Sequence, residues 1–402
     1  MYNKSGDNMK RMLILLIVTI LVVGISISIF FFDDKENRNE ESKIEEKTVI
    51  NNELPNSYDV EVFTKINIKD LTGDDNLKEI DTSKLGKQTI KYEHNGEIKE
   101  IVVNVIDSTS PYIGVGDHYS HIINTTFTFD KDVICVDNYD KNIKCILSGD
   151  YKLDELGEYS MKIEATDSNN NKTEKEFVLR VIEKPKSDAN DKIKIEDIKL
   201  DDGVSLMIDV SKWQKDIDWK KVKKAGIDYA MLRLGTQKGI DDDSVLDSYF
   251  DKNIREAQKN GIKVGVYYYS YANDIEDIKT QANWVVDQLK NYKIDLFVSL
   301  DWECWKYFND FHFNLYEFNE MGRTFLKIIS DNGYKAINYG SKNYLEHIWN
   351  IDEYGTWLAH YNDKTTYSKD YIIWQFTDKG VVPGINSVVD LNYFYYNYNK
   401  EV

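Results

Sequence analysis

The chain has 402 residues, a formal net charge of −18 and three cysteines. Nucleic-acid binding relies on clustered Lys and Arg, so this acidity argues against a nucleic-acid partner. Three cysteines are too few for a scaffold built from disulfides, and the length favours two or three domains.

Residues 12–32, "MLILLIVTILVVGISISIFFF", are an uncharged apolar run. As a helix the run reaches about 31 Å, which matches the thickness of a bilayer core. It is longer than the apolar part of a cleaved signal peptide, typically about 7–15 residues. Basic residues precede the run and acidic residues follow it, which places residues 1–11 in the cytoplasm. We therefore predict a single-pass protein of the cell membrane with the rest of the chain outside.

Residues 33–57 are polar and free of aromatic side chains, so they are predicted to form a linker rather than a folded domain. Short runs with apolar residues at alternate positions then follow, separated by Gly, Asn and Asp. This pattern is typical of β-sandwiches. It predicts a first all-β domain over residues 58–107 and a second over residues 108–184.

The two predicted β domains share an internal repeat, in which Leu85-Gly86 corresponds to Leu156-Gly157. The second copy, from "DSTSPYIGV" through "VDNYD" and "LGEYSMKIEATDSNNN" to "VLRVIEKP", resembles the bacterial Ig-like repeats of surface proteins. The resemblance is weaker for the first copy. It implies a spacer or a binding module, with other cell-surface proteins as possible partners.

Cysteine and histidine positions give little indication of a metal centre. Cys135 and Cys145 could form a disulfide outside the cell and leave Cys304 free, but three unpaired cysteines are equally compatible with the sequence. His118 and His121 lie in the second β domain and are expected to be loop residues. No metal site and no cofactor is predicted.

Residues 185–204 are charged and are expected to be a second linker, after which strand and helix patterns alternate over residues 205–402. Such alternation predicts an α/β fold whose parallel strands close into a barrel. Five connections have helical spacing, and the last two are too short for a covering helix. The eight strand candidates are residues 206–211, 228–235, 263–270, 295–303, 335–340, 356–361, 371–377 and 387–392.

Four acids occupy strand ends of this predicted barrel, where the loops of parallel barrels build their sites. Asp301 and Glu303 are two residues apart, so both point to the same face of one strand. Asp209 and Asp390 lie on the first and last strands, which are neighbours in a closed barrel. Mutual repulsion of four acids would keep at least one protonated, as a proton donor for glycoside cleavage requires.

Aromatic residues gather at the same strand ends. Flat aromatic faces suit sugar rings, and their polar edges can bond to hydroxyl groups. Some of these residues are equally explained as barrel core. Those predicted to contact substrate are Tyr267, Tyr269, Tyr339 and Trp374.

From about residue 205 to its end, the chain resembles glycoside hydrolase family 25, the muramidases of the Chalaropsis type. The matching stretches include "MIDVSKWQKDIDWKKVKKAGIDYAMLRLG", "LDWE", "INYG", "WLAHY", "WQFT" and "VVPGINSVVDLN", in the order of the family. The resemblance implies a barrel with five helical crossovers and cleavage of the β-1,4 bond between N-acetylmuramic acid and N-acetylglucosamine. It implies Glu303 as proton donor, Asp301 as its partner, and Asp209 and Asp390 as supporting acids.

The resemblance leaves the role of Asp301 open. It could act as nucleophile or base, or it could orient the substrate's own acetamido group, which we favour. Three departures from the family pattern, expected in loops and cleft walls, are Lys215 in place of a common Gly, Gln237 in place of Glu and Tyr268 in place of His.

The expected protein is a membrane-anchored muramidase whose Ig-like domains hold the barrel out in the cell wall. Its expected partners are peptidoglycan strands and, through residues 12–32, the membrane. One alternative is an inactive barrel that only binds peptidoglycan at the cell surface. A second alternative is a hydrolase of chitin-like polymers, which carry the same acetamido group.

Overall fold

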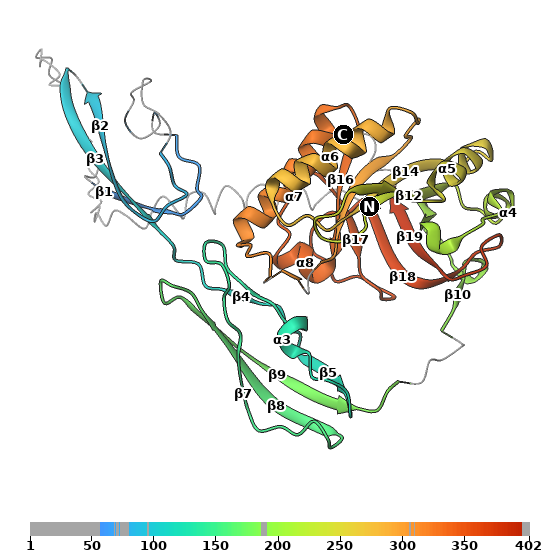
Figure 1. Ribbon diagram of the computed structural model, residues 1–402, viewed down its shortest axis with the longest axis horizontal. Helices are drawn as coiled ribbons and strands as arrows, with labels where there is room; N and C mark the ends of the chain where they lie inside the picture. Colours follow the sequence, from blue (N-terminus) through green and yellow to red (C-terminus); the bar gives the residue numbers. More distant parts are fainter. Residues whose placement is uncertain are drawn as a thin grey trace, which may run out of the picture. The chain divides into compact units, whose positions relative to one another are not determined.

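The computed structural model describes residues 57–395, apart from residues 68, 70–71, 73–79, 95, 186–190, 305–306 and 309 (Figure 1). Among the described residues, no helix is both long and apolar enough to span a bilayer. The predicted cytoplasmic segment 1–11, the predicted span 12–32 and all but the last residue of the predicted linker 33–57 lie outside the described residues.

The first module is a three-stranded sheet in the order β1-β3-β2. Strands β1 and β3 are parallel, and β2 and β3 form an antiparallel pair. Its small core includes Val62, Val103 and Val105. The described part of this module is one sheet, so the two-layered sandwich expected over residues 58–107 is not found there. The strands are β1 Ser57–Glu61, β2 Gly86–His94 and β3 Glu97–Ile106.

The second module has two sheets, β4-β6 and β5-β9-β8-β7. Strands β5, β9 and β8 repeat the topology of the first module, with a parallel pair followed by an antiparallel pair. The internal repeat in the sequence is therefore a structural repeat. The elements are β4 Tyr112–Ile113, β5 His118–Ile122, α3 Phe129–Asp132, β6 Cys135–Val136, β7 Ile146–Ser148, β8 Gly157–Thr166 and β9 Lys172–Ile182.

The structure places the three cysteines of the chain and two histidines of the second module as follows. Cys135 and Cys145 form a disulfide, and Cys304 is free and buried. His118 and His121 lie on strand β5, not in a loop. The loop expectation was wrong because "HYSHI" pairs with β9 residue by residue from His118 to Ile122.

The remaining strands form a closed barrel, with helices outside the ring of strands (Figure 1). All eight predicted strands are present, and helices α4 to α8 provide the five predicted crossovers. The strands are β11 Val204–Val210, β12 Tyr229–Gln237, β14 Lys263–Ser270, β15 Phe297–Trp302, β16 Lys335–Ser341, β17 Gly355–Ala359, β18 Ile373–Val381 and β19 Val389–Tyr395. The helices are η2 Lys212–Gln214, α4 Trp219–Lys224, α5 Phe250–Lys259, α6 Ile275–Leu289, α7 Leu315–Asp331 and α8 Lys342–His347, and strand β13 Ser244–Leu246 pairs with β12.

The barrel is not wholly parallel, which corrects the sequence prediction. Strand β19 is antiparallel to β11 and to β18, and its two pairings close the ring. The connection from β18 to β19 is too short for a crossover, so β19 must return as the second strand of a hairpin. The C-terminal ends of the parallel strands meet at one end of the barrel. The residues of β19 that lie at this end are therefore those at its own N-terminus.

The predicted linker 185–204 is also corrected in its second half. Strand β10 (Ile193–Lys194) pairs with Gly380 and Val381 of β18, and helix η1 (Ile195–Asp197) follows it. Ile195 is buried in the barrel core. The high charge of this stretch made it look like a linker, although three of its isoleucines, Ile193, Ile195 and Ile198, pack in or against the barrel core.

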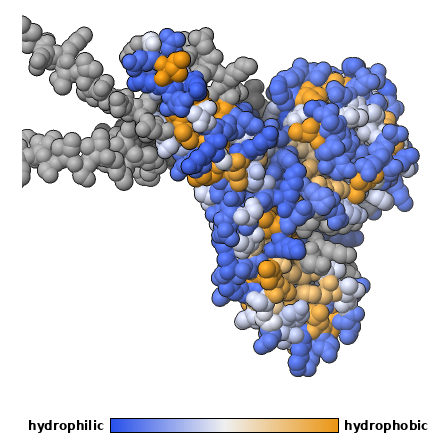
Figure 2. Space-filling view, turned by 60° about the vertical axis from the view of Figure 1, so that its left-hand side comes forward, coloured by the Kyte–Doolittle hydropathy of each residue, from blue (hydrophilic) through white to orange (hydrophobic). Residues whose placement is uncertain are grey.

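Alternate burial sorts the barrel residues into two layers. An inner layer around Met207, Met231 and Phe394 fills the barrel, and an outer layer packs against the helices. Helix α6 shows the outer contact, because Ile278, Ala282 and other apolar residues repeat at helical spacing on its buried face. On the face shown in Figure 2 the described surface is mostly hydrophilic, in keeping with a chain of which 30% is charged.

Candidate active site

A pocket of about 220 Å³ at one end of the barrel contains all four predicted acids. Strands β11, β12, β14, β15, β16, β17, β18 and β19 contribute to it directly or through the residues that follow them. The lining residues are Asp209, Val210, Ser211, Trp213, Gln214, Arg233, Tyr267, Tyr269, Asp301, Glu303, Tyr339, Trp357, Tyr361, Gln375 and Asp390.

Asp301 and Glu303 stand at the end of strand β15 and both line the pocket, as their spacing of two predicts. Asp301 is within the strand beside Tyr269 of β14 and is only 8% exposed. Its Oδ1 atom is buried and has no hydrogen-bond partner among the described residues. Glu303 follows the strand and is exposed to solvent. The two acids therefore differ in access, with Asp301 deep and Glu303 at the mouth.

Asp209 and Asp390 are direct partners in the register of β11 and β19. Asp209 is buried, and its Oδ2 accepts hydrogen bonds from Asn392 Nδ2 at 2.8 Å and Gln375 Nε2 at 3.0 Å. Asp390 is half-buried. The predicted adjacency of the first and last strands is therefore observed, although the last strand runs in the opposite direction.

Burial raises the pKa of Asp301 well above its ordinary value, and the charges of Glu303 and Asp209 raise it further, while Arg233 lowers it. The pKa of Glu303 is also raised, first because surrounding protein displaces part of its hydration and then because of the charge of Asp209. A hydrogen bond from Tyr339 Oη to Glu303 Oε1, at 3.4 Å, opposes this rise.

The pKa values of the other two acids, Asp209 and Asp390, are raised as well. Burial raises the pKa of Asp209 to about 6, against the lowering effect of its bonds from Asn392 and Gln375. Burial, followed by the charges of Asp209 and Asp378, raises the pKa of Asp390 to about 8. The cluster therefore retains protons at pH values where isolated carboxyl groups are ionised.

Three of the four aromatic residues predicted to contact substrate line the pocket: Tyr267, Tyr269 and Tyr339. Trp374 does not. It is buried outside the barrel interior, and its Nε1 donates to the carbonyl oxygen of His360 at 2.8 Å. The reason is strand alternation, since the next residue on β18, Gln375, is the one that faces the pocket.

Several pocket residues were not predicted from the sequence. Arg233 lies on β12 and forms a buried ion pair with Asp247, with Nη2 and Oδ2 2.7 Å apart. Gln375 accepts hydrogen bonds from Tyr339 Oη at 3.2 Å and Tyr361 Oη at 3.1 Å, while donating to Asp209. A polar residue at an inward position of an otherwise apolar strand is the signal that identifies Arg233 and Gln375.

The three departures from the family pattern have different surroundings. Lys215 follows helix η2 with a φ of 54°, a conformation that favours glycine. Gln237 is buried and accepts a hydrogen bond from the Tyr271 backbone, and Tyr268 is fully buried against Trp284. Neither Gln237 nor Tyr268 lines the pocket, which corrects the expectation that they form cleft walls.

The family model described as "Glycosyl hydrolases family 25" matches residues 208–385. Uncharacterized protein YegX of Escherichia coli K12 is 29% identical over 192 residues, 46% of this chain and 68% of that protein. The autolytic lysozyme of Clostridium acetobutylicum is 23% identical over 190 residues, 46% of this chain and 55% of that protein.

A solved family 25 glycosyl hydrolase from Bacillus anthracis aligns with a TM-score of 0.43 and 23% identity, covering 49% of this chain and 92% of that one. The family match includes Asp209, Asp301 and Glu303 and ends just before Asp390. Residues 208–385 are therefore similar to the glycosyl hydrolases of family 25.

Proposed function

We propose that the protein is a muramidase that hydrolyses the β-1,4 bond between N-acetylmuramic acid and N-acetylglucosamine in peptidoglycan, with Glu303 as general acid. The observation that carries the proposal is the convergence of four acids with raised pKa values on one pocket of a family 25 domain. The resemblance to an autolytic lysozyme supports the choice of substrate.

Glu303 is suited to donate the proton because it is the solvent-facing member of the β15 pair. In the first step its carboxyl proton moves to the glycosidic oxygen, and the bond from that oxygen to the anomeric carbon of the muramic acid ring breaks. The N-acetylglucosamine side leaves as an alcohol, and Glu303 becomes a carboxylate. Its raised pKa favours the protonated form that can donate to the substrate.

Substrate assistance completes the reaction. The acetamido carbonyl oxygen of the muramic acid ring attacks the anomeric carbon as the bond breaks, and Asp301 holds the acetamido nitrogen through its N–H. Water then attacks the same carbon while the Glu303 carboxylate takes a proton from it, which restores the acetamido group. The Oδ1 atom of Asp301 supports this role, because no donor in the described part of the chain bonds to it.

Arg233 and Tyr339 complete this arrangement without reacting. The charge of Arg233 opposes the rise in the pKa of Asp301, which favours the ionised form that accepts a hydrogen bond. Tyr339 donates toward Glu303 and stabilises the carboxylate formed after proton transfer.

The test is turnover of purified peptidoglycan by the full chain and by Glu303→Gln. Removing the proton donor should lower the rate of appearance of new reducing ends by a factor of about 10²–10⁴ while leaving wall binding intact. Glu256→Gln, a change of the same chemistry on the outer helix α5, should leave the rate unchanged. Equal rates for wild type and Glu303→Gln would refute the assignment of Glu303.

Mass spectrometry of the products separates muramidase from the chitin-type alternative, because only muramidase fragments end in reducing N-acetylmuramic acid. Binding without any turnover would favour the inactive, peptidoglycan-binding alternative. A covalent sugar adduct on Asp301 would replace substrate assistance by a nucleophilic role for that residue.

We further propose that residues 12–32 anchor the protein in the cell membrane, with the catalytic domain outside and the β modules as a stalk. The uncharged length of this run and the basic residues before it support the proposal. The full chain should remain in the membrane fraction after an alkaline wash, and a chain starting at residue 57 should be released. Release of the full chain by the same wash would contradict the anchor.

A further inference from the structure

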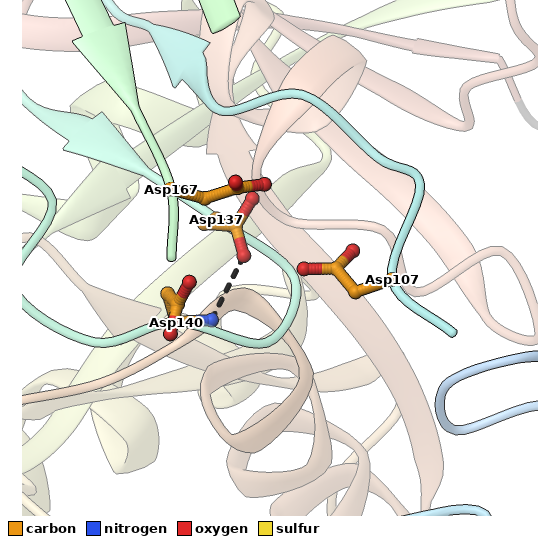
Figure 3. A group of neighbouring side chains, drawn as sticks. All are labelled: Asp107, Asp137, Asp140 and Asp167. Atoms are coloured by element: carbon orange, nitrogen blue, oxygen red, sulfur yellow. Dashed lines mark hydrogen bonds between the residues drawn. The ribbon is translucent and has the colours of Figure 1, made fainter. Parts of the chain in front are cut away.

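Four aspartates outside the catalytic domain come together near the start of the second module (Figure 3). Asp107 follows β3, Asp137 and Asp140 follow β6, and Asp167 follows β8. One carboxylate oxygen from each lies within 4.8 Å of those from the other three. Calcium binds oxygen at about 2.3–2.6 Å, so two oxygens on one ion are at most about 5 Å apart. The spacing therefore fits a single shared ion.

Asp137 supplies a second and independent sign of a ligand. Its side chain is 1% exposed, and Oδ1 accepts hydrogen bonds from the backbone N–H groups of Tyr139 at 2.9 Å and Asp140 at 2.8 Å. Its Oδ2 is buried and has no hydrogen-bond partner within the described ranges, and Figure 3 shows it directed toward Asp167. Asn138 Oδ1 is likewise buried without a partner. Buried oxygens of this kind are costly unless something binds them.

The part of the chain that the structure describes supplies no basic side chain that neutralises the cluster. Among the described residues, none of the four aspartates forms an ion pair with a Lys, Arg or His. Their donors are uncharged: Ser168 N–H bonds to Asp140 at 2.7 Å, and the N–H groups of Asn169 and Asn171 bond to Asp167 at 2.9 and 2.8 Å. Such donors orient the carboxylates, but they leave up to four negative charges close together, which a cation would offset.

We propose that Asp107, Asp137, Asp140 and Asp167 bind one calcium ion. An all-oxygen ligand set does not suit zinc, which prefers nitrogen and sulfur ligands. Magnesium requires nearly ideal octahedral geometry and retains several waters, whereas calcium accepts irregular, carboxylate-rich sites. Because Asp107 ends the first module and the other three belong to the second, the ion fastens the junction between the two modules.

Calorimetric titration of the full chain, purified in detergent and freed of metal with a chelator, tests the proposal. We expect one Ca²⁺ per chain with a Kd of about 10⁻⁴–10⁻³ M or tighter, and weaker binding of Mg²⁺. Asp137→Asn should weaken Ca²⁺ binding at least tenfold, as should Asp140→Asn at the half-exposed position. Asp150→Asn, an exposed change of charge in the same module, should leave the Kd unchanged.

Thermal unfolding tests whether Asp137 is a calcium ligand or an acid with only a structural role. In Ca²⁺ the wild type should melt higher than Asp137→Asn, whereas with chelator the order should disappear or reverse, because the mutation removes repulsion that the ion would otherwise offset. The proposal is overturned if the wild type takes up no Ca²⁺ at 10 mM, if Mg²⁺ binds as tightly, or if Asp137→Asn and Asp140→Asn retain the wild-type affinity.

Discussion

At the scale of single residues, the proton affinity of each acid in the pocket depends on its neighbours. The spacing of Asp301 and Glu303 was enough to predict that they share a face, because strand alternation is local. The neighbours that adjust Glu303 are Asp209 and Tyr339, which come from other strands. Their opposing effects follow from distance in the folded chain and could not be deduced from the sequence.

Two substitutions should move the alkaline limb of the activity profile in opposite directions. Glu303 must be protonated to act, so the rate falls as pH rises through its pKa. Asp209→Asn removes a charge that raises this pKa and should shift the limb to lower pH. Tyr339→Phe removes a bond that lowers the pKa and should shift the limb to higher pH. The measurement is kcat/KM against pH.

Rates that fall uniformly at all pH values in both variants would contradict this electrostatic account. Glu256→Gln serves as the control, because its charge lies on helix α5 outside the pocket.

At the scale of elements, local conformation and strand direction explain one departure from the family pattern and two wrong predictions. The sequence comparison marked Lys215 as unusual, and the structure gives the reason, since its positive φ suits glycine better than lysine. The prediction for Trp374 was wrong because a place at a strand end does not decide which face a side chain takes, and Gln375 is the residue of β18 that lines the pocket. The direction of β19 follows from a hairpin connection whose geometry is not visible in an apolar pattern.

Lys215→Gly should raise the free energy of unfolding by about 1 kcal/mol, because it removes strain at a positive φ. Lys212→Gly, inside the short helix η2 that Lys215 follows and without a positive φ, should lower the free energy of unfolding by a similar amount. Urea denaturation of both variants provides the measurement. Destabilisation by Lys215→Gly would show that contacts of the lysine side chain stabilise the fold by more than the backbone strain costs.

At the scale of the whole molecule, the catalytic domain begins earlier than its composition suggests. Residues 191–204 are charged, yet β10 pairs with β18 and Ile195 is buried in the barrel core. Lys379 also pairs with Asp191 at 3.1 Å. The exposed ion pair adds little stability. The buried Ile195 and the added strand β10 therefore account for most of what this segment contributes to the stability of the barrel.

A fragment that starts at residue 205 should therefore be less stable than one that starts at residue 191, by about 2 kcal/mol or more. The reason is the loss of the apolar burial of Ile195 and of the β10 pairing. Ile195→Ala in the longer fragment should reproduce most of the loss, at about 2–4 kcal/mol. Equal urea midpoints for the two fragments would show that the segment is a linker after all.

The sequence by itself determined the eight barrel strands, the five helical crossovers, the repeat in the β modules and the four acids, because periodicity and spacing act over a few residues. Only the tertiary structure decided the direction of β19, the partners Arg233 and Gln375, and the meeting of Asp107 with Asp137, Asp140 and Asp167. These depend on contacts between residues far apart in the chain, which local patterns do not encode.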